Sequence, residues 1–460
     1  MTTAEAEPAP AAEPRSYGRG ASILAVGIGV TGLVTYAYFS LASHALSDTD
    51  YGRISLLWSA IFITVSVLYR PVEQLLSRTI ADRDARGLTG TRHLRVAASI
   101  QLALGALFVV VALVLRGPLQ DDLLGGSQTL YLVLIVAVLA YAASYFARGF
   151  LAGNHRFGLY GALVFFEACS RVMFGLLAVV GVASGEGFVA LGMAAAPIFS
   201  LSVVPWALGR RLRADAAAAA AADPAADRGK AAALDAATAD EPSAEAVASG
   251  DADFTLANGA GFAAAVLLIM LAEQTFLNAG PLLLKVTADS NGAAIAGFAF
   301  NVLLIARAPL QLFQAIQTSI LPHLTKSRAT GEADAFRRSI NITLGAIAVF
   351  AGCVAIAMLA LGPWLMGLFF GSKFDYDRVG LVLISLGMGL YLSAATLNQA
   401  ALARGKAKQA CACWLTSAAA FTAFLVLADF SDRVLQMEVA YLCGACALCG
   451  LLYALYRRAD

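Results

Sequence analysis

The stretch "ISLLWSAIFITVSVLYRPVEQLLSR", residues 54–78, decides the fold of this 460-residue chain. It begins as an apolar run of helical length, because about 20 helical residues cross a hydrocarbon core of ~30 Å. It then continues without a turn signal into Arg70, Pro71 and Glu73. The stretch therefore predicts a membrane-spanning helix that carries a cation, a helix breaker and an anion.

The composition extends this prediction to the whole chain. Hydrophobic residues make up 59% of the sequence, charged residues make up 14%, and the mean hydropathy is +0.73, which is outside the range of soluble globular domains. Apolar runs of helical length recur from end to end, unlike the ~10-residue alternating segments of a membrane barrel. We expect an all-α integral membrane protein with 12 transmembrane helices, at residues 23–41, 54–76, 96–115, 130–146, 159–182, 188–208, 262–284, 293–320, 340–361, 379–402, 411–427 and 434–456.

Two polar segments divide the chain into the expected domains. Residues 1–20 are rich in Ala, Pro and Glu and predict a disordered cytoplasmic tail. Residues 209–253 are rich in Ala and Asp, lack aromatic side chains and predict a cytoplasmic linker. This linker separates an N-terminal six-helix bundle, 21–208, from a C-terminal six-helix bundle, 254–456, and residues 457–460 form a cytoplasmic C-terminal tail.

The basic residues predict the orientation. Most of the 32 lysines and arginines fall in alternate loops on one side, such as Arg83 and Arg92 after the second run and Arg148 and Arg156 after the fourth. Few fall in the loops of the other side, where Arg53 is an example. By the positive-inside rule, both termini are cytoplasmic. We therefore expect a multi-pass protein of the cell membrane.

The two halves resemble each other weakly. The segment 50–87 runs from a short external loop through the second span into a basic loop, and the segment 290–331 does the same through the eighth span. Both carry an Arg and a Pro around mid-span, as Arg70-Pro71 and as Arg307-Ala-Pro309. Because six spans is an even number, the repeats have the same orientation. Two parallel, pseudo-symmetric six-helix bundles around a central cavity are therefore expected.

These features resemble a known superfamily. Twelve spans in two parallel halves, a linker after the sixth span and a polar, Pro-containing second span that leads into "SRTIADRDARG" (77–87) are similar to the polysaccharide-export branch of the multidrug/oligosaccharidyl-lipid/polysaccharide (MOP) flippase superfamily. The similarity covers essentially the whole chain. It is a similarity of membrane topology and of the pattern of polar and apolar residues, without a catalytic motif. It implies alternating-access translocation of a polyprenyl-pyrophosphate-linked oligosaccharide from the cytoplasmic to the outer leaflet, for cell-surface polysaccharide biosynthesis. The cavity would be V-shaped and lined largely by spans one, two, seven and eight.

The resemblance also implies partners. The chain would work in the lipid bilayer on a polyprenyl-pyrophosphate-linked glycan, as a monomer, beside polysaccharide polymerase or assembly proteins and without nucleic acid. No cofactor is expected beyond a coupling Na⁺ or H⁺. The glycan and the driving force stay open.

Three arginines lie deep inside predicted spans: Arg70, Arg171 and Arg307. A charge at that depth costs at least ~2.5 kcal/mol and normally faces a partner or a wet cavity. A guanidinium group binds phosphate oxygens in a bidentate fork. The three arginines are therefore candidate ligands of the pyrophosphate, with Arg70 and Arg307 as the leading pair because both lie near a proline.

The acids at similar depth leave a second reading open, in which each arginine is neutralised by an ion pair. Glu73 lies three residues after Arg70, and Glu167 lies four residues before Arg171, so both pairs share a helix face. Arg307 has no such neighbour, and Glu273 on the seventh span is its candidate partner. The same three acids, Glu73, Glu167 and Glu273, are candidates for ion coupling.

The remaining candidates are amides and prolines. Amide side chains suit hydroxyl-rich sugars, although amides also bind helices to one another. The sugar-binding candidates are Gln74, Asn278, Asn301, Gln311 and Gln314. Pro71 and Pro309 each remove a helical hydrogen bond, and their matched positions make them candidate hinges.

Other classes of protein fit the sequence less well. No enzyme is expected, because all four histidines lie in loops or at span ends and the spans hold no nucleophile, nucleotide or metal motif. The cysteines of "CGACALC" (443–449) climb one apolar helix, which favours helix packing over a metal site. The alternative function is a cation-coupled multidrug or small-molecule antiporter of the same superfamily. That class is expected to show an acidic cation site, whereas the first span lacks an acid.

Overall fold

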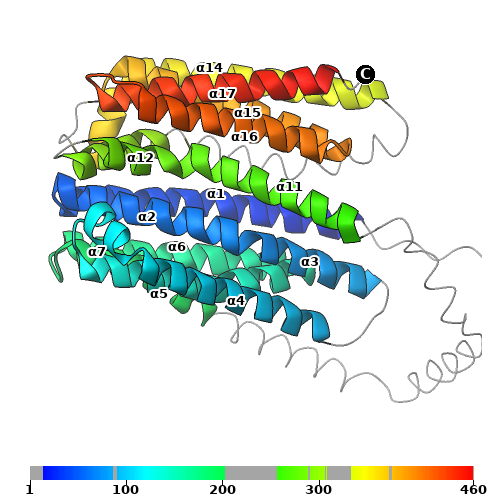
Figure 1. Ribbon diagram of the computed structural model, residues 1–460, viewed down its shortest axis with the longest axis horizontal. Coiled ribbons are helices and arrows are strands. Elements are labelled where there is room, and N and C mark those ends of the chain that lie inside the picture. Colours follow the sequence, from blue (N-terminus) through cyan, green and yellow to red (C-terminus); the bar gives the residue numbers. More distant parts are fainter. Residues whose placement is uncertain are drawn as a thin grey trace, which may run out of the picture.

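The computed structural model describes residues 14–85, 91–202, 256–288, 291–305, 307, 333–371 and 376–458. Within these ranges, side chains are described from residue 27 on, except at 28, 85, 256–264, 333–336 and 403. The predicted linker 209–253 and residues 1–13 of the predicted tail lie outside the described residues. The described chain is almost entirely helical (Figure 1).

The described part of the N-terminal half, residues 14–85 and 91–202, contains seven α-helices and one π-helical turn. They are α1 (Pro14–Ala45), α2 (Asp48–Leu68), α3 (Arg70–Ala85), α4 (Arg92–Val114), η1 (Pro118–Leu123), α5 (Gln128–Gly153), α6 (Phe157–Val179) and α7 (Glu186–Leu201). The C-terminal half contains α11 (Leu256–Gln274), the π-helical η2 (Thr275–Ala279), α12 (Gly280–Thr287), a helix at Gly292–Ile305, α14 (Ala333–Phe370), α15 (Arg378–Ala403), α16 (Ala407–Leu427) and α17 (Arg433–Arg457).

These helices confirm the predicted fold class. Among the described residues, nine helices are long and apolar enough to cross a membrane, counting α2 and α3 as one span, Asp48–Asp84. Two shorter apolar helices, Glu186–Leu201 and Gly292–Ile305, occupy the sixth and eighth predicted spans. Helix α1 supplies the first span. The chain is therefore an all-α membrane protein with twelve transmembrane helices.

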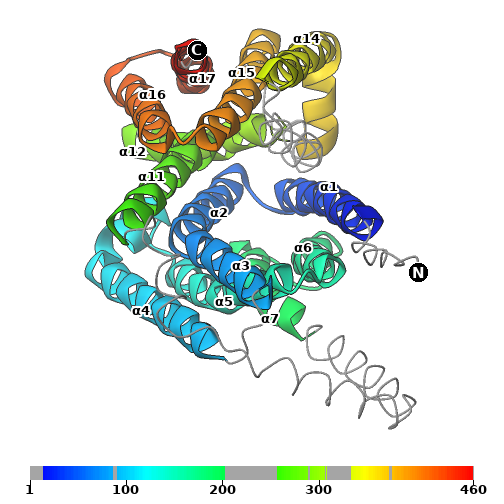
Figure 2. The same cartoon turned by 90° about the vertical axis from the view of Figure 1, so that its right-hand side faces the viewer.

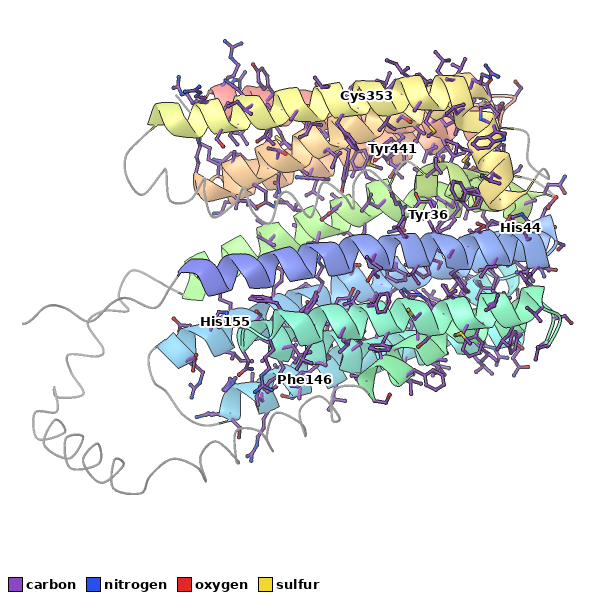
Figure 3. The ribbon with its side chains drawn as sticks, turned by 180° about the vertical axis from the view of Figure 1, so that it is seen from behind. Tyr36, His44, Phe146, His155, Cys353 and Tyr441 are labelled. Carbon is purple, nitrogen blue, oxygen red and sulfur yellow. The ribbon has the colours of Figure 1, made fainter. Side chains whose placement is uncertain are left out.

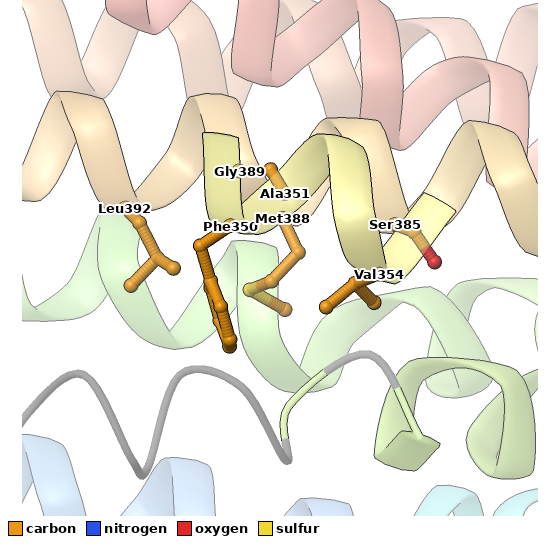
Figure 4. A pocket seen from close by; sticks show the side chains of 7 residues that line it. All are labelled: Phe350, Ala351, Val354, Ser385, Met388, Gly389 and Leu392. Carbon is orange, nitrogen blue, oxygen red and sulfur yellow. The ribbon is translucent and has the colours of Figure 1, made fainter. Parts of the chain in front are cut away.

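The helices form two bundles that lie side by side. Seen along the helix axes, α2 to α7 form one group and α11 to α17 form the other, with α1 packed on α6 at the edge of the first (Figure 2). Within the C-terminal bundle, α14 packs tightly on α15, because Gly389 leaves room for Ala351. The pocket beside this contact measures only about 10 Å³ (Figure 4), which is space for one water molecule at most.

Two spans differ from their predicted form, and the second span shows the interruption that Pro71 predicted. The second is assigned as two helices that meet at Tyr69, because Pro71 has no N–H with which to continue the hydrogen-bond ladder. The seventh contains the π-helical η2 directly before Gly280 and Pro281. The fourth continues to Gly153, well beyond the predicted end at Phe146. Each difference lies beside one of the charged or amide residues considered below.

The two bundles contact each other near the end at which α1 ends and α2 begins. A Cβ atom at Gly52 would lie 1.8 Å from the Ala293 carbonyl oxygen, so only glycine permits this approach of α2 to the helix Gly292–Ile305. Gly297 lies directly against Gly52. In addition, Ser43 of α1 donates a hydrogen bond to the Phe370 carbonyl of α14 at 2.5 Å. Figure 3 shows His44 at this end of the protein and His155 toward the other.

Candidate functional site

Buried charges in the N-terminal bundle form a network around Glu167. Its Oε2 lies 2.6 Å from Nη2 of Arg148, and its Oε1 lies 3.2 Å from Nη1 of Arg171. Ser144 donates a further hydrogen bond to Oε2 at 3.2 Å. Glu167 and Arg171 are only 2% and 3% exposed. The predicted pair of Glu167 with Arg171 is thus confirmed, but the acid is shared with a second arginine.

Aromatic residues surround these two arginines. The Arg171 guanidinium donates to the Tyr141 hydroxyl at 2.7 Å and lies 5.0 Å from the centre of the Trp58 ring. The Arg148 guanidinium lies 4.6 Å from the centre of the Tyr145 ring. Cation–π contacts of this kind stabilise a charge that is shielded from water. Arg171 is therefore placed as a structural cation with several fixed contacts.

The position of Arg148 corrects the sequence analysis, which assigned it to a basic loop. It lies inside α5 and is 9% exposed. A signal for this was present, because Tyr141, Ser144, Tyr145 and Arg148 are spaced as one face of a helix. The segment "ARGFLAG" (147–153) also contains no proline, and Gly149 is the one residue before its final glycine that disfavours a helix. The apolar run ends at Phe146, whereas α5 ends at Gly153. The sequence analysis therefore placed Arg148 in the following loop.

A second pair of charges lies beside this network on α3. Oε1 of Glu73 accepts a hydrogen bond of 2.9 Å from the Tyr160 hydroxyl of α6. Helix α3 approaches α5 closely here, because a Cβ atom at Gly149 would lie 2.8 Å from the Glu73 carbonyl oxygen. Arg70 is partly buried, and both Glu273 of α11 and Glu73 lie near enough to act on it electrostatically. Arg70 thus faces carboxylates from both bundles.

Glu273 does not pair with Arg307, which had been its candidate partner. It lies with Arg70 and with the Tyr391 hydroxyl of α15 instead. The titratable groups close to Arg307 are the phenols of Tyr441, Tyr36 and Tyr391, and no carboxylate of the described residues is among them. The ion pair that the sequence left open is therefore not formed.

Arg307 has one hydrogen-bond partner in the described part of the chain. Its Nη1 donates to Oδ1 of Asn278 at 3.2 Å, whereas its Nε and Nη2 are buried without a partner. Tyr36 reaches this region from α1, where its hydroxyl donates to the Leu304 carbonyl, and Tyr441 reaches it from α17 (Figure 3). The guanidinium of Arg307 therefore has free donor capacity and no neutralising acid among these residues.

The π-helical η2 brings an amide pair to Arg307. Nδ2 of Asn278 donates to Oε1 of Gln274 at 2.8 Å, which leaves Oδ1 of Asn278 for Arg307. Both amides are buried, at 4% and 5% exposure. A π-helical segment shifts the residues after it around the helix axis, and such segments are frequent at functional sites. This geometry was not predictable from the apolar pattern of the seventh span.

The other predicted site residues have different surroundings. Asn301 is fully buried and accepts a hydrogen bond from Tyr51 of α2, while its Nδ2 donates to Tyr376 at 3.0 Å. Gln74 is exposed on α3. Three further candidates, Pro309, Gln311 and Gln314, lie outside the described residues. Asn301 thus joins the two bundles near their contact at Gly52.

Known proteins resemble this chain in sequence and in fold. No family model matches the sequence. Uncharacterized proteins of Mycobacterium bovis and Mycobacterium tuberculosis are 24% identical over 445 residues, which cover 94% of this chain and 90% of theirs. Their names assign no activity.

Solved structures match over almost the whole chain. An inward-facing multidrug resistance MATE family transporter of the MOP superfamily aligns with a TM-score of 0.66 at 12% identity, covering 95% of this chain and 98% of that one. A mutant of the Vibrio cholerae MATE transporter VcmN aligns with a TM-score of 0.60 at 14% identity, covering 97% and 95%. A MOP superfamily transporter from Pyrococcus furiosus, whose binding pocket is described as having reverse polarity that suggests a different function, aligns at 0.59 and 13% identity, covering 97% and 96%. The chain therefore has the fold of the MATE transporters of the MOP superfamily.

Proposed function

We propose that this protein transports an anionic lipid-linked substrate, a polyprenyl-pyrophosphate-linked oligosaccharide, from the cytoplasmic to the outer leaflet by alternating access. The observation that carries the proposal is the state of Arg307. Arg70, Arg148 and Arg171 lie with Glu73, Glu167 and Glu273, so these six charges balance. Arg307 has no carboxylate among the described residues and two unused donor nitrogens.

A buried guanidinium without an acid is suited to an anion. The two oxygens of a phosphate group match the Nε and Nη2 donors of Arg307, which are the atoms without partners. The alternative substrate class, organic cations, would be repelled by this charge. The fold is compatible with both classes, since the Pyrococcus furiosus transporter is described as having a binding pocket of reverse polarity.

Roles for the neighbouring residues follow from their contacts. Asn278 would hold Arg307 in position, and Gln274 would extend the polar surface toward the sugar. Arg70 would contribute a second positive charge on the facing bundle, with Glu73 and Glu273 limiting its affinity for phosphate. We assign Arg171 a structural role, because its contacts leave it 3% exposed.

Transport in proteoliposomes tests this function. The probe is a polyprenyl-pyrophosphate-linked fluorescent oligosaccharide, and its translocation is read by quenching from outside. Arg307→Ala should reduce flipping by about 100-fold, because two charge-assisted hydrogen bonds are lost. Arg307→Lys should restore it only in part, since a point charge replaces a planar fork. The matched control is Arg433→Gln, which removes a charge that already pairs with Asp429 at 2.9 Å and should leave flipping unchanged.

Two results would contradict the proposal. One is exchange of a cationic dye for Na⁺ or H⁺ by the wild-type protein without flipping of the lipid probe. The other is full flipping by a folded Arg307→Ala protein. Ion coupling is tested in the same vesicles. If Glu273 carries a coupling H⁺ or Na⁺, Glu273→Gln should abolish the response of flipping to an imposed gradient while flipping without a gradient persists.

A further inference from the structure

A buried carboxyl group in the C-terminal bundle has no role in the proposed substrate site. Glu438 lies in the second turn of α17 and is only 5% exposed. Among the described residues, no group forms a hydrogen bond or an ion pair with its carboxyl group. Glu73 and Glu167 differ in this respect, since each accepts a hydrogen bond from a tyrosine or an arginine. A buried acid without a partner is costly if it is ionised.

The titratable groups close to Glu438 are two further acids. They are Asp377 and Asp432, the N-cap residues of α15 and α17. Each side chain accepts two hydrogen bonds from backbone N–H groups of its own helix, at distances between 2.9 and 3.2 Å. The two N-cap acids are thereby held in place, and they would repel an ionised Glu438.

The cations on the neighbouring elements do not compensate Glu438. Arg378 at the start of α15 is exposed, and Lys285 of α12 is half-buried. Arg433 in the first turn of α17 pairs with Asp429 at 2.9 Å. Helix α16 is charged only at its opposite end. None of these cations is among the titratable groups close to Glu438, so an ionised Glu438 would have no counter-charge among the described residues.

The carboxyl group of Glu438 lies against the backbone of α15. A Cβ atom at Gly380 would overlap this carboxyl group, so only glycine leaves room for it. Gly380 is the third residue of α15, and α15 packs closely on α17. A neutral carboxyl group is compatible with this position. An ionised one would be desolvated beside two acids, and it would be driven away from Gly380.

The beginning of α15 is also connected to the contact between the bundles. Tyr376 lies four residues before Gly380, and its hydroxyl accepts a hydrogen bond of 3.0 Å from Nδ2 of Asn301. Asn301 in turn accepts a hydrogen bond from Tyr51 of α2, in the other bundle. Helices α15 and α17 both begin at the end of the protein where α1 ends (Figure 1). A chain of contacts therefore runs from Glu438 through Gly380 and Tyr376 to the N-terminal bundle.

We propose that Glu438 is a proton-binding site that controls the contact between the bundles at this end. With the proton bound, the neutral carboxyl group stays packed on Gly380, and Tyr376 keeps its hydrogen bond to Asn301. When the proton leaves to the water on this side of the membrane, the carboxylate moves away from the two N-cap acids and displaces the first turn of α15. The hydrogen bond through Asn301 is then weakened, and the bundles separate at this end. The inference rests on the alternating access of the proposed function but not on its substrate.

A distance measurement across this end tests the proposal. Spin labels are attached at Val182→Cys, between α6 and α7, and at Leu427→Cys, at the end of α16. Both positions are well exposed, at 67% and 80%. The seven native cysteines are replaced by alanine, and the full-length protein is measured by pulsed electron paramagnetic resonance in lipid nanodiscs. The fraction of molecules with the longer distance should rise about tenfold between about pH 5 and about pH 9, the range over which buried carboxyl groups titrate. An unchanged distance distribution over this range would overturn the proposal.

Two variants assign the response to its group. Glu438→Gln keeps the size of the side chain and is neutral at every pH, so it should keep the shorter distance throughout. His44→Gln is the matched control, because His44 is a second titratable group at this end, beside Gly371 of α14, and it should respond to pH as wild type does. A response that persists in Glu438→Gln, or one that is lost in His44→Gln, would overturn the proposal. Lipid flipping is not needed for this readout, so a failure of the proposed substrate leaves the test intact.

A third variant tests the connection, and a salt titration tests the ligand. Tyr376→Phe removes the hydrogen bond to Asn301 and should raise the longer-distance fraction about fivefold at the lower pH. An unchanged fraction would show that this chain of contacts does not hold the bundles together, and would overturn the proposal. Na⁺ at about 0.1 M, added at constant pH against the same concentration of K⁺, should leave the distances unchanged. A response to Na⁺ would overturn the proposal in favour of a metal-cation site.

Discussion

The two bundles differ in whether their intramembrane arginines have a carboxylate partner. In the N-terminal bundle, Arg148 and Arg171 share Glu167, and aromatic rings cover the group. In the C-terminal bundle, Arg307 has an amide and three phenols around it but no acid among the described residues. A buried charge that is paired holds helices together, whereas one that is unpaired costs free energy unless a ligand supplies the opposite charge. This difference is the reason that we propose the C-terminal arginine, and not those of the N-terminal bundle, as the substrate-binding one.

Removing Glu167, the acid that Arg148 and Arg171 share, should cause the largest loss of stability. Glu167→Gln leaves two adjacent buried arginines without the carboxylate that they share, so we expect a loss of about 3 kcal/mol of stability. Thermal and denaturant unfolding in detergent measure it. The control is Glu186→Gln, whose partner Arg53 lies 3.4 Å away in a partly exposed pair, and it should cost less than about 1 kcal/mol. Equal losses would show that the network around Glu167 is no more than a surface pair.

The second largest loss of stability is expected from a substitution at the contact between the bundles. Gly52→Val places side-chain atoms where the Ala293 backbone lies, and we expect a loss of about 2 kcal/mol from overpacking. Cross-linking of cysteines introduced at Ser43 and Phe370 reports whether the bundles still meet. Gly450→Val is the control, because nothing lies within 4 Å of a Cβ atom there. Unchanged cross-linking in Gly52→Val would mean that the glycine contact does not hold the bundles together.

A smaller effect is expected at the edge of the N-terminal network. Tyr160→Phe removes the 2.9 Å hydrogen bond to Glu73, which should cost about 1 kcal/mol. Tyr453→Phe serves as a control, since Tyr453 is 44% exposed and should unfold as wild type does. A loss in the control as large as that in Tyr160→Phe would assign the effect to the ring substitution.

The smallest effect on stability is expected at Arg307. Arg307→Gln removes an unneutralised charge and keeps an amide beside Asn278, so the free energy of unfolding should change by less than about 0.5 kcal/mol or rise. Arg171→Gln leaves Arg148 as the sole cationic partner of Glu167 and removes the cation–π contact with Trp58, so it should lose about 2 kcal/mol. Unfolding of both variants under one protocol gives the comparison. Equal losses would mean that Arg307 is held by a counter-charge, and would remove the basis of the anion site.

Much of the fold was determined by the sequence itself. The lengths of the apolar runs predicted twelve membrane helices, because the thickness of the hydrocarbon core sets how many apolar residues a span needs. The four-residue spacing of Glu167 and Arg171 predicted their ion pair, because residues at that spacing face each other on one helix. Pro71 predicted an interruption, and the helix is interrupted at Tyr69.

Only the tertiary structure decided which charges meet across helices. The sequence made Glu273 the candidate ion-pair partner of Arg307. In the structure, α11 packs against α2, and Glu273 lies near Arg70 instead. Helix packing likewise brings Arg148 to Glu167. Helical periodicity defines the neighbours of a residue along its own helix, whereas a partner on another helix depends on the rotation and height of both helices. The rotation and height of each helix are set by side-chain packing, by glycine contacts such as that of Gly149 with α3, and by the π-helical segment η2. The pattern of apolar residues along the sequence predicts none of these features.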